Sequence, residues 1–210
     1  MESVLITVDQ LGEVSGPHIE ILHQAGFEIR YSPRPGFTLS EEETIEALLG
    51  VSATIAGGEP YTERVLSSLP DLRVVSRWGV GFDRIDVKAA TRYGVAIAVT
   101  PNANHEAVAE CTMAMLLATT RFLVKHDKQV RQGLWTRIAS SPLRGKTLGL
   151  IGLGRIGRSV AVRAKAFGTR ILAYETFPDK DFLKTQGIKL VDLETLLSQS
   201  DYVSLHVPLT

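Results

Sequence analysis

The chain has 210 residues, of which 44% are hydrophobic and 22% charged, and 23 lysines and arginines balance 23 aspartates and glutamates. This composition is normal for a globular protein with a sizeable core, and the balance excludes a general electrostatic attraction to nucleic acid or acidic membranes. The apolar run at the start is too short for a signal peptide and no window approaches a membrane span, so we expect a cytoplasmic protein.

Alternating strand and helix patterns fill the first half of the chain. Strands are predicted at 4–8, 27–32, 53–56, 73–76 and 96–100, and helices at 17–25, from about 41, at 62–69 and at 87–93. Ser40 is the predicted N-cap of the second helix, because Glu43 follows three residues later in a capping-box pattern. This order of elements favours a parallel, doubly wound sheet.

A long apolar helix is predicted from about 106 to 123, after the break at 101–104. Apolar side chains lie almost all round it, so it should be buried on several sides, between domains or against a second subunit. The single cysteine, Cys111, lies in this helix and is expected to be a buried small hydrophobe, with a catalytic thiol as the alternative. A more polar helix is predicted at 125–134, before Trp135.

The most informative stretch begins with the apolar run at 147–151, which does not alternate with polar residues and so predicts a strand covered on both faces. Glycines follow at Gly152, Gly154 and Gly157, in the G-x-G-x-x-G spacing. Gly152 allows a tight turn and Gly154 lets a phosphate approach the backbone. Gly157 lets the following helix lie close to the sheet.

That helix shows one apolar face up to Phe167, and Gly168 is well placed to cap it. Its start offers unpaired N–H groups to an anion. A second strand at 170–174 ends in Glu175, where such folds hydrogen-bond the adenosine ribose. The whole order predicts dinucleotide binding, with an ordinary βαβ unit as the alternative, and the charge of Glu175 favours NAD over NADP.

Beyond Glu175 the patterns predict helices at 179–186 and 193–199, and strands at 188–191 and 202–206. Asp192 is the predicted N-cap of the last helix. Only about one of the two βαβαβ halves of a dinucleotide fold is present, so the final strand would have an unfilled edge. We therefore expect these 210 residues to be part of an incomplete enzyme, either a fragment or a truncated record.

The chain resembles the D-2-hydroxyacid dehydrogenases over essentially its whole length. The most specific match is Leu148-Gly-Leu-Ile-Gly-Leu-Gly-Arg-Ile-Gly157 with Ile171-Leu-Ala-Tyr-Glu175, where the family usually has Asp at the last position. The resemblance implies an α/β fold, with a flavodoxin-like substrate domain at 1–100 and an incomplete NAD-binding Rossmann domain at 101–210. The implied NAD-binding residues are Gly152, Gly154, Arg155, Ile156, Gly157, Glu175, His206, Val207 and Pro208.

Two further matches concern the substrate. The stretch Ser76-Arg-Trp-Gly-Val-Gly-Phe-Asp-Arg-Ile-Asp86 resembles the family loop whose backbone N–H groups hold the substrate carboxylate. Gly79 and Gly81 on either side of Val80 suit that task, with a simple strand-to-helix turn as the alternative. Arg77 is a candidate partner for a substrate carboxylate or phosphate, or a member of a surface ion pair.

The segment at 102–110 resembles the family's crossing between domains, although Ala107 stands where a serine is usual. In it Asn104 matches a substrate-side asparagine and Glu110 helps to fix the helix. The family moves a hydride between C2 of a 2-hydroxy acid and the nicotinamide, aided by an arginine, a glutamate and a histidine. All three would lie beyond Thr210, so His206 is not the expected acid or base, and no catalytic residue or metal site is assigned.

The substrate stays open at this stage. 3-Phosphoglycerate is the leading named candidate, because Arg77 and Arg137 match arginines of the phosphoglycerate enzymes. Gly57, where those enzymes commonly have another arginine, and the neighbouring Glu59 suit a dianionic substrate poorly, so an unphosphorylated 2-hydroxy acid is close behind. The apolar helix suggests a homodimer.

Two other functions remain possible at the level of the sequence. One is an NAD-sensing, non-catalytic binding protein, since the C-terminal-binding-protein corepressors resemble the same family. The other is a natural truncated product that only oligomerises.

Overall fold

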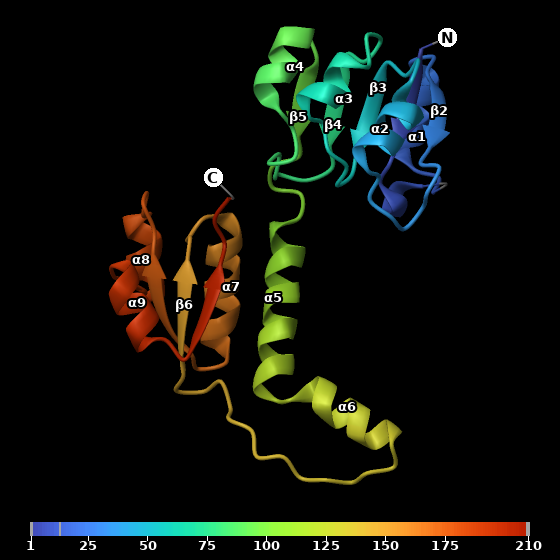
Figure 1. The fold of residues 1–210 in the computed structure, drawn as a ribbon. Helices are drawn as coiled ribbons and strands as arrows, with labels where there is room; N and C mark the ends of the chain where they lie inside the picture. The colour runs from blue at the N-terminus through green and yellow to red at the C-terminus, as the bar shows by residue number, and fades with distance from the viewer. Residues whose placement is uncertain (1, 13, 209–210) are drawn as a thin grey trace. The chain divides into compact units, whose positions relative to one another are not determined.

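The computed structural model describes residues 2–12 and 14–208. The chain divides into two compact units, one up to residue 103 and one from residue 104 onward (Figure 1). Each unit has its own parallel sheet, as the alternation of strand and helix patterns predicts. The predicted second domain runs to Thr210, but residues 209 and 210 lie outside the described part of the chain.

The first unit contains a five-stranded sheet with the order β2-β1-β3-β4-β5. All neighbours in it are parallel. This is the strand order of doubly wound folds of the flavodoxin type. Its strands are β1 (Ser3–Ile6), β2 (Glu28–Tyr31), β3 (Ala53–Ala56), β4 (Val74–Arg77) and β5 (Ala96–Val99). Its helices are η1 (Asp9–Leu11), α1 (Pro17–Gln24), α2 (Glu41–Leu48), α3 (Glu63–Ser67) and α4 (Val87–Tyr93).

One apolar cluster holds α2, α3 and α4 against this sheet. The strands contribute Leu5, Ala56 and Val75, all fully or nearly fully buried, and the helices contribute residues such as Leu48 and Val65. The predicted capping box at Ser40 is confirmed, because Glu43 N donates to Ser40 Oγ (3.3 Å) and Ser40 N donates to Glu43 Oε2 (2.8 Å). The packed helices leave the carboxyl ends of the strands as the edge from which loops can present functional groups.

The second unit contains a four-stranded parallel sheet with the order β8-β7-β6-β9. Its strands are β6 (Thr147–Ile151), β7 (Arg170–Tyr174), β8 (Lys189–Leu190) and β9 (Tyr202–Leu205). Its helices are α5 (His105–Thr120), α6 (Leu123–Arg131), α7 (Arg155–Ala166), α8 (Lys180–Gln186) and α9 (Leu193–Gln199). Helix α7 packs on β6, β7 and α5, and α8 adjoins α7 through the Arg158–Asp179 ion pair and a shared apolar cluster, while α9 also contacts β6 and β7 (Figure 1).

Two expectations for α5 were wrong. Cys111 is exposed and not buried, because α5 packs on α7 along a single stripe that includes Ala109 and Met113, and Cys111 lies outside that stripe. The helix also ends at Thr120, three residues earlier than predicted, since Phe122 takes a left-handed conformation with φ 50°. Whether a second subunit covers the exposed face stays a prediction. Other predicted elements differ from the structure mainly by a residue or two at their ends.

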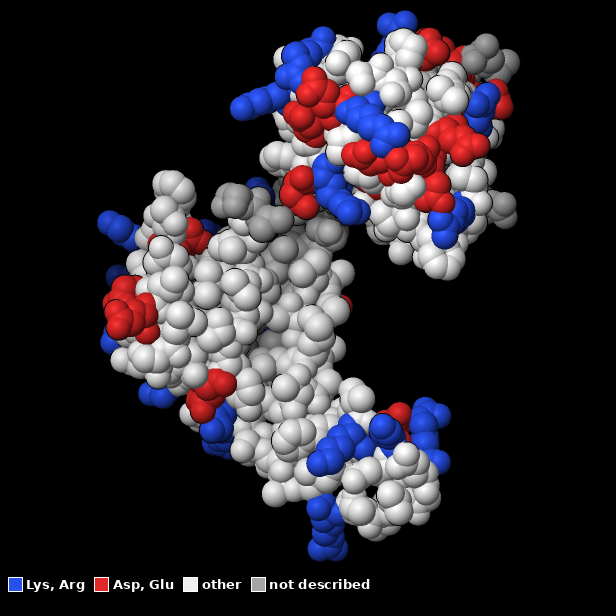
Figure 2. All heavy atoms as spheres, viewed as in Figure 1, with Lys and Arg blue, Asp and Glu red and all other residues white. Residues whose placement is uncertain are grey.

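Acidic and basic side chains are interleaved over the face of the first unit that Figure 2 shows, so this face carries no large patch of one sign. Within residues 2–12 and 14–208, no single helix combines the length and apolarity needed to cross a membrane. The pair α5 and α6, bent by 63° at the break between them, reaches those limits only when counted together.

A candidate dinucleotide loop and a candidate carboxylate loop

The connection from β6 to α7 is tightly packed at two of its three glycines. Gly152 has φ +94°, and a Cβ placed on it would lie 2.5 Å from the carbonyl oxygen of His206. A Cβ on Gly157 would lie only 2.2 Å from the carbonyl oxygen of Gly152. Both positions therefore require glycine, because real Cβ atoms do not approach backbone atoms so closely.

The middle glycine is different. No heavy atom lies within 4 Å of a Cβ built on Gly154, apart from its own neighbours in the chain. Gly154 is the N-cap of α7 and supplies no side-chain cap, so the first N–H groups of the helix, from Arg155 onward, have no partner within the helix. Open space in front of a helix start that offers N–H groups is a suitable place for a phosphate.

Glu175 lies beside this loop. Its Oε2 accepts a hydrogen bond from the N–H of Leu153 (2.6 Å) and its Oε1 accepts one from Phe177 (2.9 Å). These hydrogen bonds, from Phe177 first and from Leu153 second, hold the pKa of the Glu175 carboxyl below its usual value. The ionised acid thus meets the glycine loop at the end of β7, where a ribose would lie.

Arg158 supports the same corner, a role that its place on a polar helix face did not reveal. Its Nε donates to the carbonyl oxygen of Leu153 (3.0 Å) and its Nη1 forms an ion pair with Asp179 (2.7 Å). Its guanidinium also lies 5.3 Å from the centre of the Phe182 ring. Because these contacts occupy Arg158, this cation is poorly placed to bind a 2′-phosphate.

The end of β9 lies against the glycine loop. His206 N donates to Ile151 O (2.7 Å), and Val207 Cγ1 is 2.8 Å from the position of a Cβ on Gly152. The structure therefore brings His206 and Val207 to the glycines, while Pro208 is exposed. Burial lowers the pKa of His206, which favours the neutral ring.

The loop after β4, in the first unit, offers fewer N–H groups than the sequence suggests. Gly79 has φ +149°, and its N–H already donates to Thr100 Oγ1 (2.8 Å) and to the carbonyl oxygen of Arg77 (2.9 Å). The N–H groups of Val80 and Gly81 have no hydrogen-bond acceptor among the described residues. Of the predicted nest, only these two groups are left for a carboxylate, and Thr100 is a supporting residue that the sequence pattern did not identify.

Arg77 and Glu59 line one small cavity beneath this loop, about 70 Å³ in volume. The Arg77 guanidinium donates to the carbonyl oxygens of Ala56 and Trp78, and it has no ion pair with any described residue. The surface ion pair considered for Arg77 is therefore not what the structure shows. Glu59 is only 3% exposed, and no sequence pattern indicated that this carboxylate is buried.

Asn104 and Glu110 belong to the second unit. Asn104 is the N-cap of α5 but makes no side-chain capping bond, and its pairing with the substrate stays a prediction. Glu110 lies 3.6 Å from Arg163, which also bonds to Glu106, so carboxylates of α5 are tied to α7. These contacts agree with a role for Glu110 in fixing the helix.

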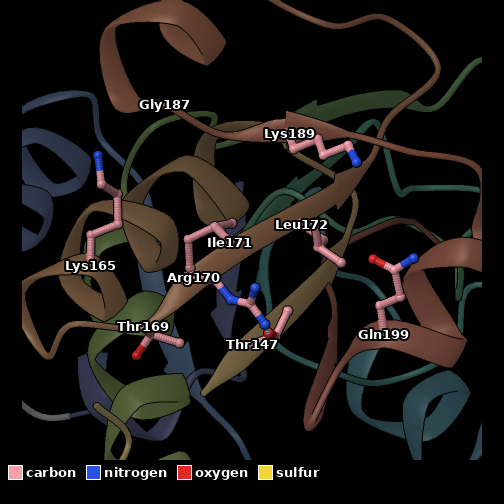
Figure 3. Close-up of a pocket in the computed structure, with 9 residues that line it drawn as sticks. All are labelled: Thr147, Lys165, Thr169, Arg170, Ile171, Leu172, Gly187, Lys189 and Gln199. Carbon is pink, nitrogen blue, oxygen red and sulfur yellow. Dashed lines mark hydrogen bonds between the residues drawn. The ribbon is translucent and has the colours of Figure 1, made fainter. Parts of the chain in front are cut away.

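A larger cavity of about 390 Å³ lies elsewhere in the second unit, at the amino ends of β6 and β7. Lys165, Arg170 and Lys189 line it, but Figure 3 shows their charged groups pointing in different directions. Arg170 donates to Thr147 Oγ1 (2.7 Å) and Lys165 to the carbonyl oxygen of Gln186. Open α/β sheets bind ligands at the opposite, carboxyl ends of their strands, so we assign no ligand to this cavity.

Comparison with known proteins adds three findings. Residues 113–210 match the family model of the D-isomer specific 2-hydroxyacid dehydrogenase, NAD binding domain. A glyoxylate reductase from Korarchaeum cryptofilum is 45% identical over 159 residues, which are 72% of this chain and 48% of the relative. A D-3-phosphoglycerate dehydrogenase from Methanocaldococcus jannaschii is 37% identical over 214 residues, covering 100% of this chain and 39% of the relative.

The fold is similar to that of solved members. A D-lactate dehydrogenase from Aquifex aeolicus, whose structure was determined with NAD and lactic acid, superposes with a TM-score of 0.78 at 31% identity. That alignment covers 100% of this chain and 61% of the other. The chain thus spans less than half the length of the two curated relatives above and less than two thirds of the solved one.

Proposed function

Since this chain belongs to the D-isomer specific 2-hydroxyacid dehydrogenase family, we propose that the protein containing it is an NAD-dependent oxidoreductase. The reaction is the interconversion of a D-2-hydroxy acid and its 2-keto acid. The observation that supports this most is the corner formed by Gly154 and Glu175, where an open helix start and an ionised carboxylate lie beside one backbone turn. Those two features suit a pyrophosphate and a ribose.

The proposed roles of the cofactor-binding residues combine the family resemblance with their positions in the second unit. Gly154 and the N–H groups at the start of α7, from Arg155 to Gly157, receive the pyrophosphate, and Gly152 and Gly157 allow the turn. Glu175 accepts hydrogen bonds from the adenosine ribose and disfavours NADP. His206, Val207 and Pro208 lie on the adenosine side. Bound NAD supplies the hydride acceptor or donor, while these residues only bind and orient it.

The substrate carboxylate is held in the first unit. The N–H groups of Val80 and Gly81 donate to it, and Arg77 supplies a positive charge. Gly79 shapes the loop, and Asn104 is a further substrate residue by the family resemblance alone. By the family resemblance, the arginine, glutamate and histidine that handle the proton and the carbonyl lie beyond Thr210.

NADH oxidation by the full-length protein tests this proposal. The panel contains glyoxylate, pyruvate, hydroxypyruvate and 3-phosphohydroxypyruvate, the 2-keto acid of 3-phosphoglycerate. NADH oxidation with at least one acid supports the proposal, and the absence of NADH oxidation with every acid overturns it. NAD binding without turnover would instead favour an NAD-sensing binding protein.

A homodimer is part of the proposal. On and after α6, several large apolar side chains are exposed among the charged ones, namely Val124, Val130, Leu134 and, at 90%, Trp135. A second copy of the chain is the simplest partner for such a surface, since most soluble oligomers are homo-oligomers. Light scattering on wild type and on Trp135→Arg tests it. A monomeric wild type would remove the homodimer, whereas a dimer weakened by the substitution supports it.

A further inference from the structure

A buried carboxylate occupies the point in the first sheet where ligands of such folds bind. The strand order reverses direction between β1 and β3, which are neighbours although β2 separates them in the chain. In open α/β sheets, the crevice at the carboxyl ends of two such strands is the usual ligand site. Thr7 follows β1 and Gly57 follows β3, and the Glu59 side chain bonds to both.

The buried Glu59 side chain is held by three polar groups, all at one of its two oxygens. Its Oε1 accepts hydrogen bonds from Thr7 Oγ1 (2.5 Å), Tyr61 Oη (2.8 Å) and the N–H of Gly57 (3.2 Å). Burial, and then the charge of Glu59, raises the pKa of Tyr61 well above its usual value, so the phenol remains a donor. These contacts hold the Glu59 side chain at the carboxyl ends of β1 and β3.

This charge lies next to the loop that, in the proposed function, receives the substrate carboxylate. Glu59, Arg77 and Gly81 all line the same cavity of about 70 Å³. The other charged residues of its lining are Arg84 and Asp83, so the two arginines are balanced by two carboxylates. One substrate carboxylate already exceeds this balance, and a second anionic group near Glu59 would find no further cation in the lining of this cavity.

We propose that Glu59 is a specificity-determining residue that rejects substrates with a second anionic group and admits 2-keto acids whose side chain is uncharged, including hydroxyl-bearing ones. The inference rests on the proposed function, which it narrows. Of the two substrate classes left open above, it selects the unphosphorylated acids. Gly57 adds to the selection, since it contributes no cation and leaves Glu59 as the nearest charged side chain in its stretch of the loop.

The test compares hydroxypyruvate with 3-phosphohydroxypyruvate, because these two 2-keto acids differ only in the phosphate. Both are assayed with NADH and the full-length protein, for wild type, Glu59→Gln, Glu59→Asp and Glu46→Gln. Glu46 is an exposed residue of α2, so its substitution removes the same charge from the same unit away from the cavity. Circular dichroism and thermal unfolding verify that each variant is folded.

Wild type should prefer hydroxypyruvate in kcat/KM by about a hundredfold or more, given the several kcal/mol that close like charges cost. Glu59→Gln should lower this preference by about tenfold or more, mainly through a lower KM for the phosphorylated acid. Glu59→Asp, which keeps the charge, and Glu46→Gln should retain the preference of wild type.

Several results overturn the inference while leaving the proposed function intact. One is that wild type prefers the phosphorylated acid. Another is that Glu59→Gln folds and keeps the wild-type ratio of kcat/KM for the two acids. If Glu59→Gln does not fold, the wild-type ratio and the Glu59→Asp ratio decide, and preference for the phosphorylated acid in either one is contrary. Failure to reduce any acid overturns the proposed function itself, so the two failures are distinguishable.

Discussion

The two units carry comparable loops that use their backbone very differently. In the second unit, the turn after β6 is packed at Gly152 and Gly157 and leaves open space at Gly154. In the first unit, the turn after β4 also contains spaced glycines, but the N–H of Gly79 is already bonded to Thr100 Oγ1. The glycine loop is thus a tightly packed turn with an open helix start, whereas the carboxylate loop is held by hydrogen bonds to side chains.

This difference explains why the two loops suit different ligands. The start of α7 can offer several neighbouring N–H groups to an extended anion such as a pyrophosphate. The loop after β4 has only the Val80 and Gly81 N–H groups left among the described residues, and Arg77 and Glu59 lie beneath it with opposite charges. It suits one small carboxylate. Substitutions that disturb packing in the loop after β6 and hydrogen bonding in the loop after β4 should therefore have different effects on stability and on ligand binding.

The largest effect is expected from Gly157→Ala. Its Cβ would lie 2.2 Å from the carbonyl oxygen of Gly152, a backbone atom that cannot move without distorting the turn after β6. We expect a loss of about 3 kcal/mol in the free energy of unfolding of the second unit, at the upper end for overpacked sites, and loss of NAD binding. Urea denaturation measures the first and calorimetry the second. Gly154→Ala, with open space at its Cβ, is the matched control and should change stability little; equal losses in both variants would contradict the packing argument.

The next prediction concerns NAD binding alone, without a change in stability. Gly154→Val places a branched side chain where no heavy atom lies within 4 Å, so the fold should tolerate it. The same side chain would occupy the space that a phosphate needs, and we expect NAD affinity to fall by about tenfold or more, which corresponds to about 1.4 kcal/mol. Calorimetric titration of the full-length protein with NAD measures it. A folded Gly154→Val with unchanged affinity would show that the phosphate binds elsewhere.

Much of the fold could be predicted because it depends on local patterns. Strand β6 and the Ser40 capping box are confirmed, since an unbroken apolar run and the spacing of Ser40 and Glu43 each favour one local structure. The exposed position of Cys111 could not be predicted in this way. Composition indicates that α5 is apolar, but which stripe packs on α7 depends on three-dimensional contacts, and the packed stripe leaves Cys111 out.

The candidate sites also contain features that local sequence patterns predict and features that depend on three-dimensional contacts. The glycine spacing and the acid after β7 depend on backbone geometry, and the structure places Glu175 at the glycine loop. The roles of Thr100 and Glu59 depend on contacts with residues far along the chain, such as the bond between Thr7 and Glu59, which are 52 positions apart. No periodicity or spacing indicates such contacts, so the sequence showed only that Glu59 is close to Gly57, and neither its burial nor the cavity that it shares with Arg77.

A smaller effect is expected from Glu175→Gln as the pH falls. The folded-state pKa of Glu175 is lowered, chiefly by hydrogen bonds from Phe177 and Leu153, so its ionised form stabilises the fold above the unfolded value of about 4.5. That contribution is lost as the pH falls from this value through the folded pKa. Wild type should therefore lose more stability than Glu175→Gln between pH 5 and about pH 3, as measured by urea denaturation. Glu194→Gln, exposed on α9, is the control. If stability falls with pH equally in wild type and Glu175→Gln, the hydrogen bonds from Leu153 and Phe177 to Glu175 do not stabilise the fold.

The smallest effect tests the hydrogen-bonded loop of the first unit. Thr100→Val keeps the shape of the side chain but removes the oxygen that accepts the Gly79 N–H at 2.8 Å. Gly79 still bonds to the carbonyl oxygen of Arg77, so the loss of stability should be about 1 kcal/mol or less. A looser loop holds its Val80 and Gly81 N–H groups less well, and the KM for the keto acid should rise a few-fold while the KM for NADH stays unchanged. Thr91→Val on α4, whose hydroxyl bonds only within its own helix, is the matched control. A rise in the KM for NADH in place of the acid would mean that this loop serves the cofactor, and the contrast between the two units would then fail.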